Sequence, residues 1–125
     1  MSSNRRPLIF VVDDHTAIAS TLTEILGESG FECMGFSDPL EALSAAKSNP
    51  PDVLIADVLM PKMNGIDLAL RTKTLSPSTK VLILTALMDV GELIGQARGY
   101  DFDILQKPFP PPELVTKLKS LSAND

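Results

Sequence analysis

Polar side chains that could carry out chemistry follow four short apolar segments of this 125-residue chain, at the points where buried strands would end. They are Asp13 and Asp14 after Leu8–Val12, Asp57 after Val53–Ala56, Thr85 after Val81–Leu84, and Lys107 after Phe102–Gln106. The carboxyl ends of parallel strands share one edge of a sheet, where α/β proteins bind their ligands. The spacing therefore predicts one site made from these five residues.

Three carboxylates in one site repel each other unless they take up protons or bind a cation. Two carboxylates about 5 Å apart repel by roughly 3 kcal/mol at an effective dielectric near 20. Because the chain has a single histidine and a single cysteine, the ligands are oxygen atoms, which suit Mg²⁺ better than Zn²⁺. Magnesium beside a hydroxyl and an ammonium group favours phosphoryl transfer, with Asp57 as the nucleophile and Thr85 and Lys107 neutralising phosphoryl oxygens.

Along the chain, short apolar runs alternate with stretches of helical periodicity, and these segments must position the site. This pattern predicts strand–helix units and a parallel sheet. Strands are expected at Leu8–Val12, Cys33–Phe36, Val53–Ala56, Val81–Leu84 and Phe102–Gln106. Helices are expected after Asp14 to near Gly30, from Pro39 to before Asn49, from Asn64 to near Ser76, over Val90–Ala97, and from Pro110 to about Leu121. We expect a doubly wound α/β fold with a five-stranded sheet in the order 2-1-3-4-5, which is flavodoxin-like.

Length and composition indicate a single domain over residues 1–125, with a core from about residue 7 to 121 and frayed ends. The net charge of -5 and the scattered Lys and Arg residues disfavour direct binding of DNA or RNA. The single cysteine, Cys33, excludes an internal disulfide, and residues 1–6 show no signal-peptide pattern. No apolar stretch approaches the roughly 20 residues that cross a bilayer, so we expect a cytoplasmic protein without membrane contact.

The motif set resembles that of bacterial response-regulator receiver domains over essentially the whole chain. It comprises the acidic pair Asp13-Asp14, the segment Asp57-x-x-Met-Pro-x-Met-x-Gly, Thr85-Ala86, and Lys107-Pro108-Phe109. The resemblance implies that Asp57 accepts a phosphoryl group from a phosphohistidine on a sensor histidine kinase or a histidine phosphotransfer protein. It thus implies a phosphoacceptor that assists its own phosphorylation and slow dephosphorylation, not an enzyme that turns over external substrates.

The resemblance also implies roles for individual residues. Mg²⁺ would be bound directly by Asp14, Asp57 and the backbone carbonyl of Leu59, with Asp13 acting through water. Thr85 and Lys107 would hold the phosphoryl group. The Lys107–Pro108 peptide bond would be cis, a form that is common only before proline.

Three positions depart from the family pattern. Receiver domains carry Phe or Tyr three residues before the motif lysine, where the ring changes position on activation, but this chain has Ile104. The positions that tune phosphoryl lifetime, two residues after the phosphoacceptor and two after the threonine, are Leu59 and Leu87. Neither leucine can orient a water molecule, so we expect slow self-dephosphorylation.

Phosphorylation would add about -1.5 to -2 charge at Asp57 and reshape a surface for a downstream protein partner. The resemblance places this surface on the predicted helix over Val90–Ala97, the last strand and the last helix. Gly91 and Gly95 each cost about 1 kcal/mol against alanine inside a helix, so this helix should be the loosest. The protein would be a monomer or a phosphorylation-dependent dimer.

Other interpretations of the same residues are possible. Asp13 and Asp14 by themselves could cap the first helix. A degenerate receiver could act without phosphate, a phosphatase of the haloacid dehalogenase type would need an aspartate where Leu59 stands, and a flavodoxin-like cofactor binder would not place two aspartates after its first strand. His15 is expected in the exposed first turn of a helix and not as a phosphohistidine, because histidine phosphotransfer modules are helical bundles.

Overall fold

The computed structural model describes residues 6–86, 95–96, 99–100 and 102–122. Most of the helix predicted over Val90–Ala97, including Gly91, lies outside the described residues, as does Leu87, although Gly95 and Gln96 are helical. No helix of the described ranges is long and apolar enough to cross a membrane.

The sheet has five parallel strands in the order β2-β1-β3-β4-β5, which confirms the predicted fold. The strands are β1 (Leu8–Val12), β2 (Glu32–Phe36), β3 (Val53–Asp57), β4 (Lys80–Thr85) and β5 (Asp103–Gln106). Asp57 and Thr85 are therefore the last residues of their strands, whereas the sequence analysis placed both just beyond the strand end. The order of strands reverses between β1 and β3, which is where a doubly wound sheet opens a crevice for ligands.

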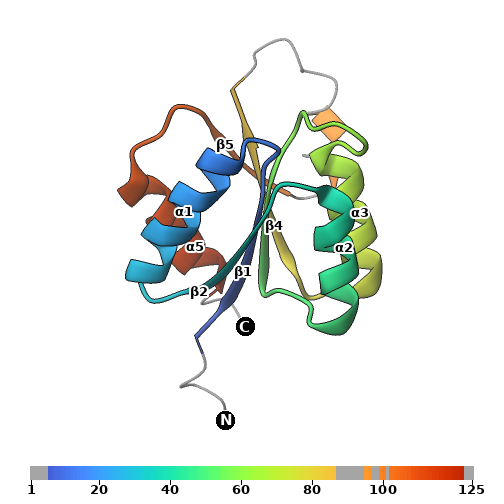
Figure 1. The fold of residues 1–125 in the computed structure, drawn as a ribbon, viewed down its shortest axis with the longest axis horizontal. Helices are drawn as coiled ribbons and strands as arrows, with labels where there is room; N and C mark the ends of the chain where they lie inside the picture. Colours follow the sequence, from blue (N-terminus) through green and yellow to red (C-terminus); the bar gives the residue numbers. More distant parts are fainter. Residues whose placement is uncertain (1–5, 87–94, 97–98, 101, 123–125) are drawn as a thin grey trace.

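Helices cover both faces of the sheet (Figure 1). Their bounds are α1 (Thr16–Glu28), α2 (Pro39–Ser48), α3 (Gly65–Leu75) and α5 (Pro111–Ser122). In Figure 1, α1 and α5 lie on one side of the sheet, and α2 and α3 lie on the other. Each helix can return the chain to the same end of the sheet, so that all strands run in parallel.

The core consists of two apolar layers, one on each face of the sheet. Along β1, Ile9 and Val11 face the layer under α1 and α5, whereas Leu8, Phe10 and Val12 face the layer under α2 and α3. All five side chains are buried. Burial on both faces explains why the strands appear in the sequence as continuous apolar runs.

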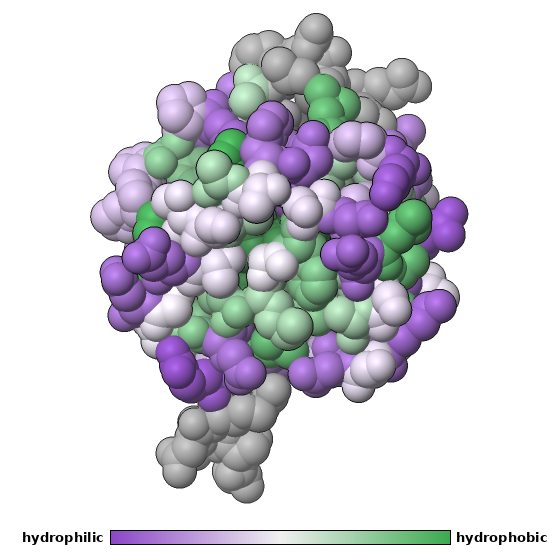
Figure 2. Space-filling model, viewed as in Figure 1, coloured by the Kyte–Doolittle hydropathy of each residue, from purple (hydrophilic) through white to green (hydrophobic). Residues whose placement is uncertain are grey.

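The edge strands are less buried, and β2, which pairs with β1 alone, is the more exposed of the two. Met34 is 41% exposed, and Phe36 contacts the Phe10 ring at a centroid distance of 4.9 Å. Figure 2 shows pale and green residues at the centre of this face, where β2 runs in Figure 1, with hydrophilic residues around them. The weak strand pattern of this segment reflects its partial exposure.

The helix starts follow from local hydrogen bonds. The Asp38 side chain accepts a hydrogen bond from the backbone N–H of Leu40 at the start of α2, where Pro39 occupies the first turn. Asn64 caps α3 by accepting from the N–H of Asp67 at 2.9 Å. The N-cap of α1 is His15, with no side-chain capping bond, so the expectation that His15 lies within the first turn was wrong by one position.

Arg6 was predicted to fray, but its guanidinium donates hydrogen bonds to the carbonyl oxygens of Gly27, Gly30 and Phe31, at 3.2, 3.3 and 3.0 Å. These carbonyls lie at the end of α1 and in the turn that follows, where helix carbonyls lack intrahelical partners. Arg6 therefore satisfies backbone acceptors that the sequence pattern does not reveal.

Candidate functional site

Strand register brings the predicted site residues to one edge of the sheet. Val12 pairs with Ala56 across β1 and β3, so Asp13 and Asp57 each follow a paired position on neighbouring strands. Asp57 in turn pairs with Leu84 of β4, and Thr85 is the next residue. This edge lies at the reversal of strand order, as the sequence predicted.

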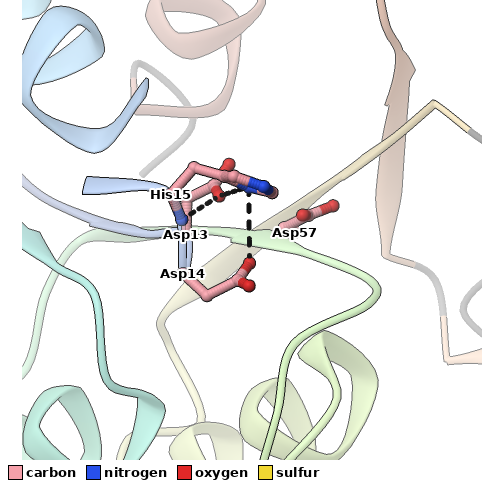
Figure 3. A group of neighbouring side chains, drawn as sticks. All are labelled: Asp13, Asp14, His15 and Asp57. Atoms are coloured by element: carbon pink, nitrogen blue, oxygen red, sulfur yellow. Dashed lines mark hydrogen bonds and ion pairs between the residues drawn. The ribbon is translucent and has the colours of Figure 1, made fainter. Parts of the chain in front are cut away.

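Four side chains converge there: Asp13, Asp14, His15 and Asp57 each offer one ligand atom, and these atoms all lie within 4.8 Å of one another. Figure 3 shows the four side chains around a common space, with dashed lines from the His15 ring to Asp13 and Asp14. The three carboxylates were predicted to meet. His15 was not predicted to join them, and its only sequence signal was its position directly after the acidic pair.

Asp13 is the most buried member of the group, with 1% of its side chain exposed. Its Oδ1 accepts a hydrogen bond from the backbone N–H of His15 at 2.9 Å, and its backbone N–H donates to the carbonyl of Phe36 at 3.0 Å. Its Oδ2 accepts from the ammonium group of Lys107 at 3.3 Å. Neither Asp13 nor Asp14 occupies the N-cap of α1, so the capping alternative is wrong.

Lys107 directly follows β5, which lies two strands away from β3, and its side chain extends back to the site. Its Nζ lies 3.3 Å from Asp13 Oδ2 and 3.8 Å from Asp57 Oδ1. Its backbone N–H donates to the carbonyl of Thr85 at 2.7 Å, and the Lys107–Pro108 peptide bond is cis. The ammonium group thus lies beside two of the three carboxylates and offsets part of their negative charge.

Asp57 is held in an unfavourable electrostatic environment. Burial raises the pKa of its carboxyl group above the ordinary value, the nearby Asp13 and Asp14 carboxylates raise it further, and the Lys107 ammonium opposes them. The side chain remains 13% exposed, so a reactant can approach it from solvent. This is the environment of a carboxylate that gains from a cation or from losing its negative charge.

Asp14 carries the clearest sign of an additional ligand. Its Oδ1 is shielded from solvent and accepts no hydrogen bond among the described residues, and the nearest cationic candidate, His15 Nδ1, is 3.6 Å away. A buried acceptor without a partner costs about 1–3 kcal/mol. Together with the oxygen donors of Asp13 and Asp57, this orphan acceptor fits a divalent cation.

Thr85 and three of the positions predicted to tune the switch, Leu59, Ile104 and Pro108, lie in the described part of the chain, whereas Leu87 does not. Thr85 is 6% exposed, and the Leu59 side chain is 43% exposed two residues after Asp57. Ile104 pairs with Ile83 across β4 and β5 and packs against the core under α2 and α3. Phe102 is also in that core, at 6% exposure, so the ring nearest in sequence to Ile104 is a packing residue.

Gly65 lies next to the site, and the sequence did not show why a glycine is needed at this position. It is the first residue of α3, and its backbone N–H donates to the carbonyl of Val58 at 2.9 Å. A Cβ at this position would overlap the carbonyl oxygen of Asp57. The glycine that ends the Asp57 motif therefore lets α3 approach the end of β3 closely.

Comparison with known proteins gives a family for this arrangement. Residues 9–119 match the family model for the response regulator receiver domain. The DNA-binding response regulator MtrA of Mycolicibacterium paratuberculosis is 37% identical over 122 residues, which cover 96% of this chain and 53% of MtrA. The DNA-binding transcriptional regulator NtrC of Escherichia coli strain K12 is 36% identical over 111 residues, covering 89% of this chain and 24% of NtrC.

Solved structures show the same fold. A putative response regulator from Chloroflexus aurantiacus superposes with a TM-score of 0.84 at 33% identity, covering 96% of this chain and all of that one (100%). A CheY-like receiver domain protein from Methanospirillum hungatei has a TM-score of 0.86 at 26% identity, with 95% of each chain covered.

The match spans nearly the whole chain, whereas the chain spans about half the length of MtrA, 53%. The general function of the matched family is to accept a phosphoryl group in two-component signalling, and its members generally bind Mg²⁺ in an acidic pocket. The strand order, the acidic cluster and the family match agree. The chain belongs to the response regulator receiver domain family.

Proposed function

We propose that Asp57 is the phosphoacceptor of a two-component switch. The observation that carries this proposal is the environment of its carboxylate, which has the Lys107 ammonium 3.8 Å away and two further carboxylates in the same group. A structural salt bridge between Lys107 and Asp57 would not need two further carboxylates in the same group. A phosphoryl-transfer site does, because a cation and a lysine must both approach the nucleophile.

The metal proposed for this site is Mg²⁺, held by Asp14, Asp57 and the backbone carbonyl of Leu59, with Asp13 acting through water. The orphan Oδ1 of Asp14 and the oxygen-rich donor set support a hard cation. When bound, the ion would neutralise negative charge on the incoming phosphoryl group. It would also relieve the repulsion that raises the pKa of Asp57.

In the proposed reaction, a carboxylate oxygen of Asp57 attacks the phosphorus of a phosphohistidine in line. The new oxygen–phosphorus bond forms as the nitrogen–phosphorus bond of the donor breaks, and the product is an acyl phosphate on Asp57. The Lys107 ammonium and the Thr85 hydroxyl are each proposed to hold one phosphoryl oxygen. Lys107 also lowers the pKa of Asp57, which favours the ionised, nucleophilic form.

The proposed donor is a sensor histidine kinase or a histidine phosphotransfer protein, and the proposed output is a change in a protein-binding surface. That surface would include β5 and α5, together with the segment over Val90–Ala97, most of which lies outside the described residues. The curated relatives MtrA and NtrC are called DNA-binding. For this chain, with its net charge of -5, we propose signalling from the cytoplasm through a protein partner, as a monomer or a phosphorylation-dependent dimer.

The test is phosphorylation with acetyl phosphate and Mg²⁺, followed by the intact mass of the protein. Wild type should gain one phosphoryl group, and Asp57→Asn should gain none. Asp67→Asn, which changes an exposed carboxylate on α3, is the matched control and should be phosphorylated like wild type. Phosphorylation of Asp57→Asn at the wild-type rate would refute the assignment, and an unreactive wild type would favour a receiver that acts without phosphate.

A further inference from the structure

His15 lies on a backbone that is fixed from both sides. Its N–H donates to Asp13 Oδ1 at 2.9 Å, and its carbonyl accepts from the N–H groups of Ile18 and Ala19 at 3.0 and 3.1 Å. Only the two side-chain torsions of the histidine remain to be set. The position of the imidazole relative to the acidic group is therefore well defined by the start of α1.

The imidazole is not used to cap the helix. His15 is the N-cap residue of α1, where Ser, Thr, Asp or Asn would bond a backbone N–H, yet its side chain makes no capping bond. Instead, Nδ1 lies 3.2 Å from Asp13 Oδ1 and 3.6 Å from Asp14 Oδ1. In Figure 3, the ring extends toward the side of the group on which Asp57 lies.

The imidazole is exposed, with 66% of the His15 side chain open to solvent, although the carboxylate oxygens that it contacts are shielded. The ring can turn from these oxygens toward a bound ion without leaving a buried group of its own unpaired. The ligand atoms of all four residues lie within 4.8 Å of one another, and two ligands of one ion with bonds of about 2.0–2.2 Å lie up to roughly 4.4 Å apart. The imidazole nitrogen and the carboxylate oxygens therefore lie close enough for side-chain rotation to bring them to a single ion.

A nitrogen ligand changes which metals a site prefers. Mg²⁺ takes oxygen ligands and gains little from imidazole, whereas imidazole binds Ni²⁺, Cu²⁺ and Zn²⁺ well. We propose that His15 is a nitrogen ligand of the acidic site, so that the site also holds a first-row transition cation, with the imidazole added to Asp14, Asp57 and the backbone carbonyl of Leu59. This inference rests on the proposed metal site and adds a fourth direct ligand to it.

The test compares wild type with His15→Asn in protein without a histidine tag. Asparagine is a good N-cap residue, so this variant keeps the start of α1 and removes only the imidazole. Calorimetric titration with Ni²⁺ should show an affinity at least about tenfold weaker in the variant. Loss of a residue that only hydrogen-bonds to a metal ligand already weakens metal binding by about tenfold or more, so loss of a direct ligand should cost at least as much. The affinity for Mg²⁺ should change by less than about twofold, since hard cations do not need the imidazole.

A spectroscopic readout identifies the ligand directly. The chain contains one histidine, so imidazole nitrogen coupling to bound Mn²⁺ in pulsed electron paramagnetic resonance can come only from His15. We expect this coupling in wild type and its loss in His15→Asn. Equal Ni²⁺ affinities in the two proteins, or equal losses for Ni²⁺ and Mg²⁺, would overturn the proposal.

Phosphorylation separates this proposal from the proposed function. With acetyl phosphate and Mg²⁺, wild type should be phosphorylated on Asp57 whether or not His15 binds a metal. If it is, while Ni²⁺ affinity does not depend on His15, the nitrogen ligand is refuted and the phosphoacceptor role stands. If wild type binds Ni²⁺ through His15 but is not phosphorylated, the metal ligand stands and the phosphoacceptor role fails.

Discussion

Gly65 and Asp57 are in direct main-chain contact at the point where β3 ends and α3 begins. A Cβ on Gly65 would overlap the Asp57 carbonyl oxygen, and it would lie 2.9 Å from the carbonyl carbon and 3.3 Å from the Cα of Val58. These neighbours are backbone atoms, which cannot rotate aside as a flexible side chain can. The loop from Asp57 to Gly65 therefore returns to its own origin, and the direction of the Asp57 side chain depends on this closure.

Replacement of Gly65 by alanine should lower both stability and phosphorylation. Because the added methyl group must push α3 away from β3, we expect a loss of about 1–3 kcal/mol in the free energy of unfolding, as for other overpacked sites. The same displacement moves Asp57 and should slow its phosphorylation by acetyl phosphate. Urea unfolding and the rate of mass gain measure the two effects.

Gly27→Ala is the matched control for this change. Gly27 lies within α1, and nothing stands within 4 Å of a Cβ placed there. Alanine inside a helix is about 0.5–1 kcal/mol more favourable than glycine, so this variant should be more stable than wild type and equally reactive. Equal stability of Gly65→Ala and wild type would show that α3 can move without cost.

Asp57→Asn should be more stable than wild type near neutral pH in the absence of metal. Burial raises the pKa of Asp57, so the folded protein keeps this proton to a higher pH than the unfolded chain does. As pH rises from the ordinary carboxyl pKa through the raised one, the unfolded chain loses its proton first, and wild type loses stability. The variant lacks this loss, so its advantage should disappear in acid.

Denaturant unfolding at a series of pH values in EDTA measures this difference. Addition of Mg²⁺ should then stabilise wild type by about 2.7 kcal/mol at 100 times its dissociation constant, and should stabilise Asp57→Asn less because one ligand is lost. A constant stability difference between the two proteins at all pH values would contradict the raised pKa.

Lys107→Gln should raise the pKa of Asp57 further and slow phosphorylation. The Lys107 ammonium lowers this pKa in wild type, and glutamine removes the positive charge while it keeps a side chain of similar length. We expect phosphorylation about 100-fold slower, the scale seen when one donor to a developing anion is removed. The carboxyl ¹³C shift of Asp57, followed against pH without metal, reports the pKa.

Lys62→Gln tests whether the effect depends on position. Lys62 lies in the loop from Asp57 to Gly65, and its ammonium group pairs with Asp38 at 3.0 Å and not with Asp57. This variant should leave the pKa of Asp57 and the rate of phosphorylation as in wild type. An equal shift in both variants would mean that net charge, and not the contact with Lys107, sets the pKa.

Leu59→Asn combined with Leu87→Glu should shorten the lifetime of the phosphorylated protein. The Leu59 side chain is exposed and has no group that could hold a water molecule near the phosphoryl group. One added hydrogen bond worth about 1.4 kcal/mol in the transition state corresponds to about tenfold faster hydrolysis. The time course of mass loss after removal of acetyl phosphate measures the rate, and an unchanged lifetime would disprove the hypothesis.

Most element bounds were predictable because they depend on local patterns. The strands of a parallel sheet are buried on both faces, so β1 is visible as a continuous apolar run. The start of α2 was visible as Asp38-Pro39, since an N-cap residue and a first-turn proline act within a few residues. β2 was the least certain strand, because partial exposure at the sheet edge weakens the apolar pattern.

The sequence by itself determined which residue types stand at the strand ends, and therefore the chemistry that the site can support. Asp13, Asp14, Asp57 and Lys107 could be grouped because alternating strands and helices predict a parallel sheet, in which all strands end at the same edge. Only the tertiary structure decided the contacts that depend on a helix start or a close approach. His15 lies beside the carboxylates because α1 begins there. A glycine is needed at position 65 because α3 contacts β3 through backbone atoms, and the distance between these atoms cannot be predicted from a residue pattern.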